Sequence, residues 1–306
     1  MKRKVLSILA LLLMAATGAT AQTTYTVSVK EGTEDADKWT ADPNPAAAGQ
    51  TVTVTYTGTK KVKSVKAKKK AAPAPAAPTL TLGEMTQGGD PLNNGSGSET
   101  YYSPTFSAGQ QVAVIYKNTS GQTVKVLSDA LTASDISNEG KSATINVTID
   151  DADKTQPVTY IYPATMAKDD GTINFNFTAQ SGTEASLSTV RNCCKGSGAW
   201  DGNALPSVSM ASQIAIWKLT MKDDHDGNIY FQNVTVKVGG YTVAYASTTS
   251  DYFPNSIVYL ALNPATMGTG TLRIEADEYG EIYYYQKSGG VSLTAGKFYQ
   301  STLNME

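Results

Sequence analysis

The residue with the widest chemical range in this sequence is its single histidine, His225, which lies in the acidic run Asp223-Asp224-His225-Asp226-Gly227-Asn228. A Ser-His-Asp triad would have to use this histidine, but no strand–turn–helix nucleophile elbow accompanies it. A zinc site would need more histidine or cysteine ligands than the chain can bring together. The sequence therefore favours a protein that is not an enzyme and predicts no catalytic residue.

Three oxygen-bearing side chains of this run, Asp224, Asp226 and Asn228, have the alternate spacing of a calcium-binding loop. The full motif also needs a bidentate acidic residue at the end of the loop, and none occurs at that spacing. Asp-Gly sequences are usually ordinary turns, because Asp bonds to nearby backbone and Gly accepts unusual backbone angles. We expect a turn, with calcium as the alternative, and no cofactor.

The only two cysteines, Cys193 and Cys194, are neighbours in the sequence. An exported chain meets oxidising conditions, but a disulfide between neighbours needs a strained ring and closes no useful loop. A redox role is disfavoured because the C-x-x-C spacing is absent. We expect two small, semi-buried residues in a connection, with a vicinal disulfide as the alternative.

Two further groups have the residue types of a carbohydrate-active or carbohydrate-binding site. The paired acids Asp277 and Glu278 have the chemistry of glycoside hydrolysis, although acidic residues in turns commonly keep β proteins soluble. The run Tyr283-Tyr284-Tyr285, with Tyr279, would offer rings for stacking on a glycan. Alternating tyrosines on a strand are more often half core and half cover, and we expect that arrangement here.

The elements that carry these residues are short strands. Residues 158–162 are β-branched and aromatic, and Pro163 ends the run because proline has no N–H for a β ladder. After the turn at 169–171, apolar residues at 173, 175 and 177 alternate with polar ones, which is typical of a half-buried strand. Pro-Ala-Thr-Met at 163–166 recurs at 264–267, 101 residues later (264 − 163 = 101), again between strand-like arms. We therefore predict one hairpin shared by two similar β domains.

The composition supports an all-β protein. Of the 306 residues, 41% are hydrophobic, which is enough for packed cores, and only 17% are charged. Many short strands separated by turn signals point to β-sandwiches. We predict two tandem sandwiches after a small N-terminal β module, with these bounds: signal peptide 1–21, β module 22–67, Lys/Ala/Pro-rich linker 68–78, first sandwich 79–195 and second sandwich 196–306.

The N-terminus predicts export. Three basic residues precede an apolar run that is too short to span a membrane, and a small-residue cleavage site follows, between Ala21 and Gln22. Removal of this segment leaves 25 − 3 = 22 basic against 27 acidic residues, a net charge of −5. This acidity argues against a nucleic-acid partner, and no later stretch has the length and hydropathy of a transmembrane segment.

At this point the sequence resembles the fimbrillin-like surface proteins of the Bacteroidales. The blocks that resemble their first domain are 106–116, 160–164 and 171–175, and those that resemble their second domain are 232–238, 258–264 and 293–299. The resemblance covers roughly residues 79–306 and implies two transthyretin-like β-sandwiches carried on the cell surface. It implies a structural or accessory fimbrial subunit that mediates adhesion, with other subunits or copies of itself as partners.

The resemblance also implies assembly by β-strand addition. In polymerising family members, a protease cut after an arginine releases the first strand of the sandwich, and a strand of the next subunit fills the groove. This chain departs from the family in two ways. It has no lipobox cysteine after the cleavage site, and its only arginines are Arg3, Arg191 and Arg273. A cut at the lysine-rich run 60–70 is one alternative route. The alternative function is a non-polymerising secreted or surface-attached module that binds glycans or proteins of a host or neighbouring cell.

Overall fold

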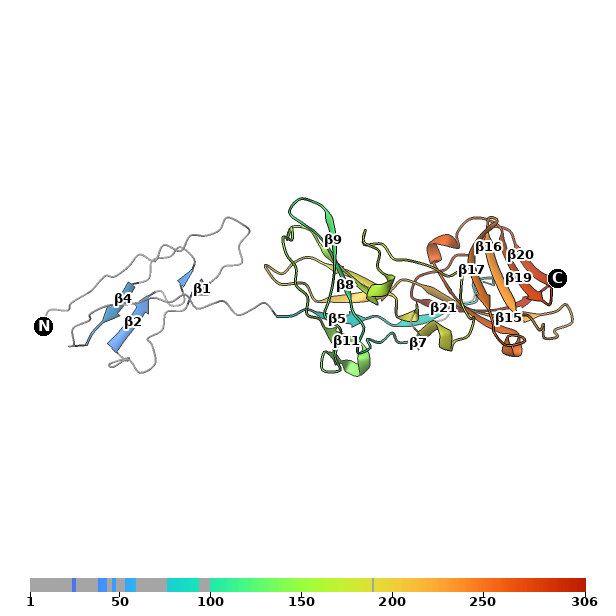
Figure 1. Cartoon of the computed structure of the whole chain (residues 1–306), viewed down its shortest axis with the longest axis horizontal. Helices are drawn as coiled ribbons and strands as arrows, with labels where there is room; N and C mark the ends of the chain where they lie inside the picture. Colours follow the sequence, from blue (N-terminus) through green and yellow to red (C-terminus); the bar gives the residue numbers. More distant parts are fainter. Residues whose placement is uncertain are drawn as a thin grey trace. The chain divides into compact units, whose positions relative to one another are not determined.

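The computed structural model describes residues 24–25, 38–42, 46–47, 53–58, 76–93, 100–188 and 190–306. The chain divides into two units, Met1–Ala76 and Ala77–Glu306, which are coloured along the sequence in Figure 1. The predicted cleavage site at Ala21 and Gln22 and the lysine-rich run 60–70 lie outside the described residues. None of the described helices has the length and apolar character needed to cross a membrane.

In its described residues, the N-terminal unit has two small antiparallel strand pairs. Strand β1 (Thr24–Tyr25) pairs with β3 (Ala46–Ala47), and β2 (Trp39–Asp42) pairs with β4 (Thr53–Tyr56). The rings of Trp39 and Tyr56 lie 4.7 Å apart across the second pair. The larger unit holds both sandwiches, and the prediction of an all-β chain is confirmed: among the residues that the structure describes, the helical elements are short 3-10 turns.

The first sandwich is built from one eight-stranded sheet in the order β10-β11-β5-β14-β13-β12-β8-β9. Its inner face encloses a core in which Leu80, Val114, Tyr160 and Met210 are fully or almost fully buried. The strands are β5 (Thr79–Leu82), β8 (Ala113–Lys117), β9 (Thr123–Leu127), β10 (Ile136–Ser137), β11 (Ser142–Thr144), β12 (Val158–Tyr162), β13 (Cys194–Gly198) and β14 (Val208–Ser212).

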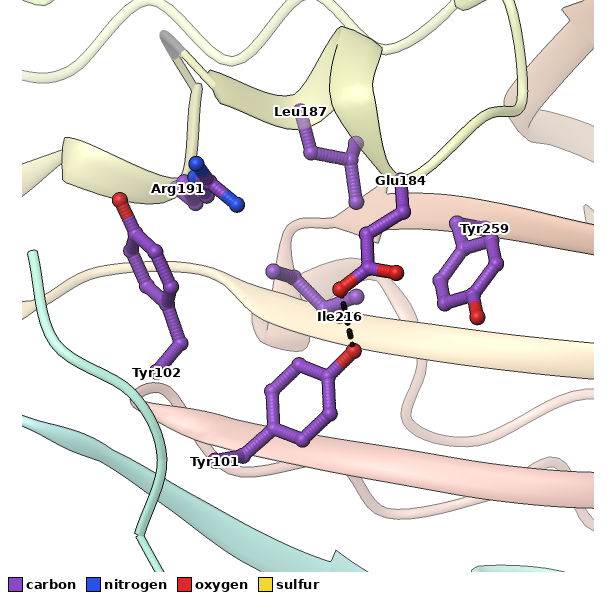
Figure 2. A pocket seen from close by; sticks show the side chains of 7 residues that line it. All are labelled: Tyr101, Tyr102, Glu184, Leu187, Arg191, Ile216 and Tyr259. Atoms are coloured by element: carbon purple, nitrogen blue, oxygen red, sulfur yellow. Dashed lines mark hydrogen bonds between the residues drawn. The ribbon is translucent and has the colours of Figure 1, made fainter.

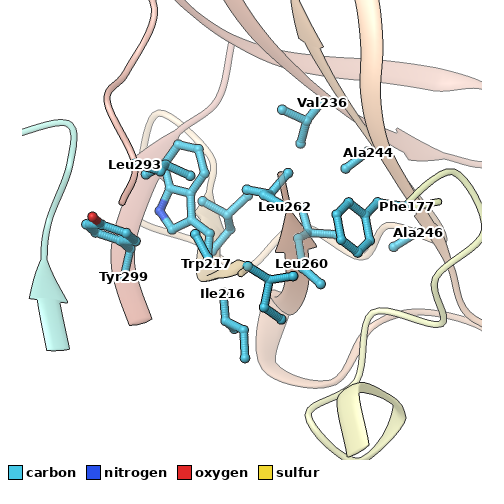
Figure 3. Close-up of a cluster of buried hydrophobic side chains, with 14 of the residues drawn as sticks. Phe177, Ile216, Trp217, Val236, Ala244, Ala246, Leu260, Leu262, Leu293 and Tyr299 are labelled. Carbon is cyan, nitrogen blue, oxygen red and sulfur yellow. The ribbon is translucent and has the colours of Figure 1, made fainter. Parts of the chain in front are cut away.

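The second sandwich packs a five-stranded sheet, β18-β15-β21-β6-β7, against a four-stranded sheet, β17-β16-β19-β20. The strands are β6 (Met85–Gly89), β7 (Thr100–Tyr102), β15 (Ala215–Lys222), β16 (Asn233–Val238), β17 (Tyr241–Ser247), β18 (Ile257–Leu262), β19 (Leu272–Glu278), β20 (Glu281–Lys287) and β21 (Lys297–Asn304). Figure 3 shows Trp217 in the middle of the core between these sheets. Its indole N–H donates to Ser301 Oγ at 3.0 Å, which satisfies the one polar group of this buried ring.

Several strands pass between the sandwiches. Strands β6 and β7 come from the predicted range 79–195 but belong to the five-stranded sheet, where β6 runs parallel to β21. Strand β14 comes from the predicted range 196–306 but pairs with β5 and β13 of the first sheet. The two parallel routes β5–β6 and β14–β15 therefore cross the junction in the same direction.

The predicted shared hairpin, in which the second arm pairs with the first, is wrong in both copies. After β12, Pro163 begins a 3-10 turn closed by a hydrogen bond from Met166 N to Pro163 O (3.0 Å). One antiparallel bridge, between Ala167 and Ile173, closes the turn that follows, but residues 172–178 form no strand and do not pair with β12. In the second copy, β18 and β19 flank the equivalent turn but lie in opposite sheets. The alternation at 173–177 correctly indicated a half-buried segment, but Ile173 and Phe177 belong to the hydrophobic cluster that contains the core of the second sandwich and the outer face of β8 and β12. Both copies are therefore crossovers, in which the chain leaves the strand before the turn, and in the second copy it passes to the opposite sheet.

The segment after this crossover covers two sheet edges of the second sandwich. The backbone of Phe177 and Gln180 bonds to Tyr245 and Ser247 on the edge strand β17 at 2.9–3.0 Å. The Gln180 side chain reaches the edge strand β18, where its Oε1 accepts from Ala261 N at 2.8 Å. A third edge, β20, is covered because Tyr284 N and O bond to the backbone of Glu306 at 2.9 and 2.8 Å. Three of the four edges of these two sheets are thus paired within the described residues.

Candidate functional site

The first strand of the first sandwich, β5, is the candidate site, because it is a short internal strand that joins two parts of its sheet. On one side it pairs antiparallel with β11, and on the other it runs parallel to β14. The sequence Thr-Leu-Thr-Leu alternates β-branched polar and apolar residues, which suits a strand with one buried face. Strand β5 begins at Thr79, where the sequence predicted the first strand of the sandwich.

Two side chains anchor β5 in the core. Leu80 and Leu82 are buried in the cluster that also contains Phe106, Ile145 and Met210. Burial of a leucine is worth about 1.5–3 kcal/mol relative to an exposed side chain. The hydrophobic anchoring of β5 is therefore about 3–6 kcal/mol, which is a large part of the 5–15 kcal/mol that stabilises a typical domain but does not exceed it.

Backbone contacts fix both ends of β5. At its start, Thr79 N donates to Ser207 Oγ at 2.9 Å. At its end, Leu82 N donates to Lys141 O and Gly83 N to Met210 O, both at 2.8 Å. A Cβ on Gly83 would lie 3.2 Å from Met210 O, so glycine lets the chain pass close to β14 before it enters the second sandwich.

If β5 left its position, β11 and β14 would face each other across a slot one strand wide. Both flanking strands would then present unpaired backbone donors and acceptors, and the core beneath would be open where Leu80 and Leu82 lie. A strand that refills this slot must run in the direction of β5, because only that direction restores the parallel ladder with β14. It must also carry two apolar side chains at alternate positions.

Apart from β5, a cluster of polar side chains surrounds a cavity of about 10 Å³ (Figure 2). It joins β7, the 3-10 turns η4 (Ala185–Ser188) and η5 (Val190–Asn192), and strands of the five-stranded sheet. Tyr101 donates to Glu184 Oε1 at 2.9 Å, and its ring stacks on Phe298. The Arg191 guanidinium lies 4.0 Å from the centre of the Tyr102 ring. A cavity of this size has room for about one water.

This polar cluster is better suited to joining elements than to catalysis. Burial, followed by the hydrogen bond to Glu184, raises the pKa of Tyr101 well above its usual value. Burial also raises the pKa of Tyr102, against the opposing effect of Arg191. Both phenols therefore stay protonated and act as hydrogen-bond donors. Sequence reasoning missed the cluster, because the adjacent tyrosines at 101–102 show no local sign of their partners around residue 190.

The acidic run 223–228 forms the expected turn. Asp223 Oδ1 accepts from Gly227 N at 2.6 Å and from His225 N at 2.9 Å, which lowers the pKa of this carboxyl. Of the predicted calcium ligands, Asn228 accepts from Lys222 Nζ at 2.7 Å, and Asp224 pairs with His225. The structure brings together a different set, Asp223, Asp224 and His225, on the surface. The calcium site of Asp224, Asp226 and Asn228 stays a prediction.

The adjacent cysteines are free thiols that enter different cores. Cys193 packs in the cluster that contains the core of the second sandwich and the outer face of the first sheet, whereas Cys194, the first residue of β13, packs in the core of the first sandwich. A vicinal disulfide would require one side chain to leave its core. Burial raises the pKa of both thiols to about 12, which keeps them protonated and unreactive near neutral pH.

The tyrosine run on β20 divides between core and cover, as expected. Tyr283 and Tyr285 pack against the core of the second sandwich. Tyr284 lies on the outer face, where the Arg273 guanidinium is 4.1 Å from its ring centre and its hydroxyl donates to Glu306 at 3.0 Å. The nearby Asp277 accepts from Gly280 N at 2.8 Å, which is the bonding of a turn residue.

No protein-family model and no curated protein matches this sequence. Several of the solved structures that match it come from the Bacteroidales. A fimbrial protein from Bacteroides ovatus is 10% identical over 76% of this chain, with a TM-score of 0.34, and this chain spans 49% of its length. A Bacteroides ovatus chain assigned to cell adhesion is 11% identical, with 76% and 95% of the two chains covered and a TM-score of 0.40. A fimbrial assembly protein from Parabacteroides distasonis is 9% identical, with 74% and 89% covered and a TM-score of 0.35. Because these identities and TM-scores are low, we base the functional proposal on the residues of this chain.

Proposed function

We propose that this chain is a cell-surface fimbrial subunit, structural or accessory, that takes part in adhesion and assembles by β-strand addition at the position of β5. The observation that carries the proposal is the placement of β5 between β11 and β14, with only Leu80 and Leu82 as buried anchors. The sequence blocks that resemble fimbrillin-like proteins support the same function. Enzyme activity is not part of the proposal.

The start of β5 suits strand exchange. The compact unit begins at Ala77, directly before β5, so a cut in the preceding linker would leave β5 as a terminal strand. Terminal strands unfold locally at lower cost than strands held at both ends. An incoming strand would replace the ladders to both neighbours and insert its own alternate apolar side chains.

The arginine-directed route does not suit this chain. Arg191 stacks on Tyr102, and its Nε is buried, so the bond after it is a poor protease site. Arg273 lies in the central strand β19 and bonds to Glu275 Oε1 at 2.7 Å. A lysine-directed cut within residues 60–70 is the route we propose, since it would precede β5.

The proposal can be tested by supplying a replacement strand. The exported chain would be cut in its lysine-rich run and incubated with a labelled peptide of residues 77–86. We expect the peptide to bind only the cut chain, and a peptide with serine at positions 80 and 82 to fail, because it lacks both apolar anchors. Chain that never binds the peptide, stays monomeric and is absent from sheared surface fibres would contradict the proposal.

A second candidate function is a non-polymerising surface module that binds a ligand. The observation that favours it is a group of exposed tyrosines at the end of the second sandwich, far from β5. Peptide binding at β5 separates the two candidates, because a non-polymerising module would not exchange that strand.

A further inference from the structure

Three exposed tyrosines gather at one end of the second sandwich, and we call Tyr230, Tyr252 and Tyr279 the tyrosine tip. Each follows the carboxyl end of a strand: β15, β17 and β19 in turn. The register places the ends of β17 and β19 together, because Asn233 on β16 faces both Ser247 at the end of β17 and Asp277 near the end of β19. Tyr230 joins them because it lies three residues before Asn233 and its ring contacts that of Tyr252. The side chains are 50%, 43% and 71% exposed.

Buried phenylalanines hold two of these rings in place. The ring centres of Tyr230 and Tyr252 are 4.9 Å apart at 79°, an edge-to-face pair. Their neighbours Phe231 and Phe253 point inward, with rings 5.1 Å apart in the core, and Phe253 N donates to Phe231 O at 2.9 Å. The exposed pair is therefore fixed before any ligand arrives, which lowers the entropic cost of binding.

The third ring, that of Tyr279, belongs to a residue with a strained backbone. Tyr279 has φ of 50°, the left-handed region, which a bulky residue other than glycine rarely adopts. Asn or Gly would fit this turn with less strain. Strain of this kind is concentrated at functional sites, and here it presents an aromatic ring to solvent.

The chemistry of the tyrosine tip points to a carbohydrate. Exposed aromatic rings offer flat apolar faces with a polar hydroxyl at the rim, which match the apolar C–H face and hydroxyl edge of a sugar ring. The exposed acidic residues Asp226 and Asp251 lie within four residues of Tyr230 and Tyr252 in the sequence, and carboxylates accept hydrogen bonds from hydroxyl groups. The same negative charges repel acidic sugars. The nearby edge strand β20, where a peptide backbone would otherwise pair, is already covered by Glu306.

We propose that the tyrosine tip binds neutral polysaccharides and disfavours anionic ones. This inference rests on the proposed function, since it names the class of partner for an adhesive surface protein. Tyr241 provides a matched control, because it lies on the same sheet and is 80% exposed, but at the opposite end of β17.

The experiment measures retention of the exported chain on immobilised mannan, galactan, xylan and glucan, with polygalacturonate and heparin as anionic probes. We expect retention on at least one neutral probe, and at least tenfold weaker binding by the double variant Y230A/Y252A. The variant Y279G should also bind at least tenfold more weakly while its melting temperature does not fall, because glycine relieves the strained backbone angle. Y241A should bind like the unchanged chain.

Three results would overturn the inference: no retention on any neutral polysaccharide, unchanged binding by the tip variants, or an equal loss in Y241A. Retention only on a parallel panel of extracellular-matrix proteins would show that the partner belongs to another class. Incorporation into sheared surface fibres, measured separately, distinguishes this failure from failure of the proposed function. Tip variants should still enter the fibres, since β5 is unchanged.

Discussion

The strands β5 and β21 hold similar positions but differ in how strongly they are held. Each is an internal strand, but β5 has one parallel neighbour, whereas both neighbours of β21 are parallel to it. Strand β21 runs beside β15 from Lys297 to Asn304 and buries Phe298, Tyr299 and Leu303, whereas β5 runs from Thr79 to Leu82 and buries two leucines. Under the proposed strand addition, length and burial, more than position in the sheet, would determine which strand is exchanged.

The largest expected effect comes from breaking the anchorage of β21. Phe298→Ala should lower the free energy of unfolding by about 3–5 kcal/mol, because it leaves a cavity where the ring packs in the core and against Tyr101. Urea denaturation would measure the change. Gln300→Ala, at an exposed position of the same strand, should have little effect, and an equal loss would mean that β21 is not held by its buried face.

The equivalent change in β5 should be smaller and local. Leu80→Ala should cost about 2–3 kcal/mol and should increase hydrogen exchange in β5, β11 and β14 before it does so in the second sandwich. Hydrogen exchange read by mass spectrometry would locate the opening. Thr81→Ala is the control in the same strand. Uniform loosening of both sandwiches would refute the contrast between β5 and β21.

A smaller effect is expected from the polar contact beneath β21. Trp217→Phe removes the hydrogen bond to Ser301 Oγ but keeps most of the apolar volume, and should cost about 1 kcal/mol. Ser301 would still donate to Asp90 Oδ1, which it reaches at 2.6 Å. The shift in the urea midpoint measures this cost, and Trp217→Ala should cost several-fold more, because it also empties the core.

The smallest expected effect is a pH dependence of the second sandwich. The hydrogen bond from Lys237, assisted by Arg273, holds the pKa of Glu275 below its ordinary value of 4.5. The folded state therefore gains stability from this carboxylate above pH 4.5 and loses it as the pH falls through the lowered pKa. Glu275→Gln should flatten this acid-side loss in urea midpoints, and an unchanged slope would show that other carboxylates account for it.

Local patterns in the sequence predicted the strands better than their partners. In β16, Val234, Val236 and Val238 alternate with more polar residues and lie on its buried face, as the period of two indicates. The same kind of alternation at 173–177 predicted burial but not the core, since a period of two indicates a face and does not indicate which sheet lies opposite. Nothing local indicates that Met85, three residues after Leu82, enters the other sandwich.

The candidate site shows the same limit. The sequence predicted a first strand near Thr79, and β5 is there. Its position between an antiparallel and a parallel neighbour depends on β11 and β14, which lie far along the chain. The tyrosine tip also depends on pairing, because Tyr230 and Tyr252 meet only when the strands before them are aligned.

The covered edges of the second sandwich have a consequence for the symmetry of any assembly. Gln180 bonds to the edge strands β17 and β18, and Glu306 bonds to the edge strand β20. An incoming strand therefore cannot pair with these edges as it could with the neighbours of β5 if β5 left the first sandwich. A subunit that accepts a strand at one sandwich and not at the other has two unlike ends. Contacts between copies would then be head-to-tail rather than two-fold. A fibre built from them would be polar, with one end that still accepts a strand and one that does not.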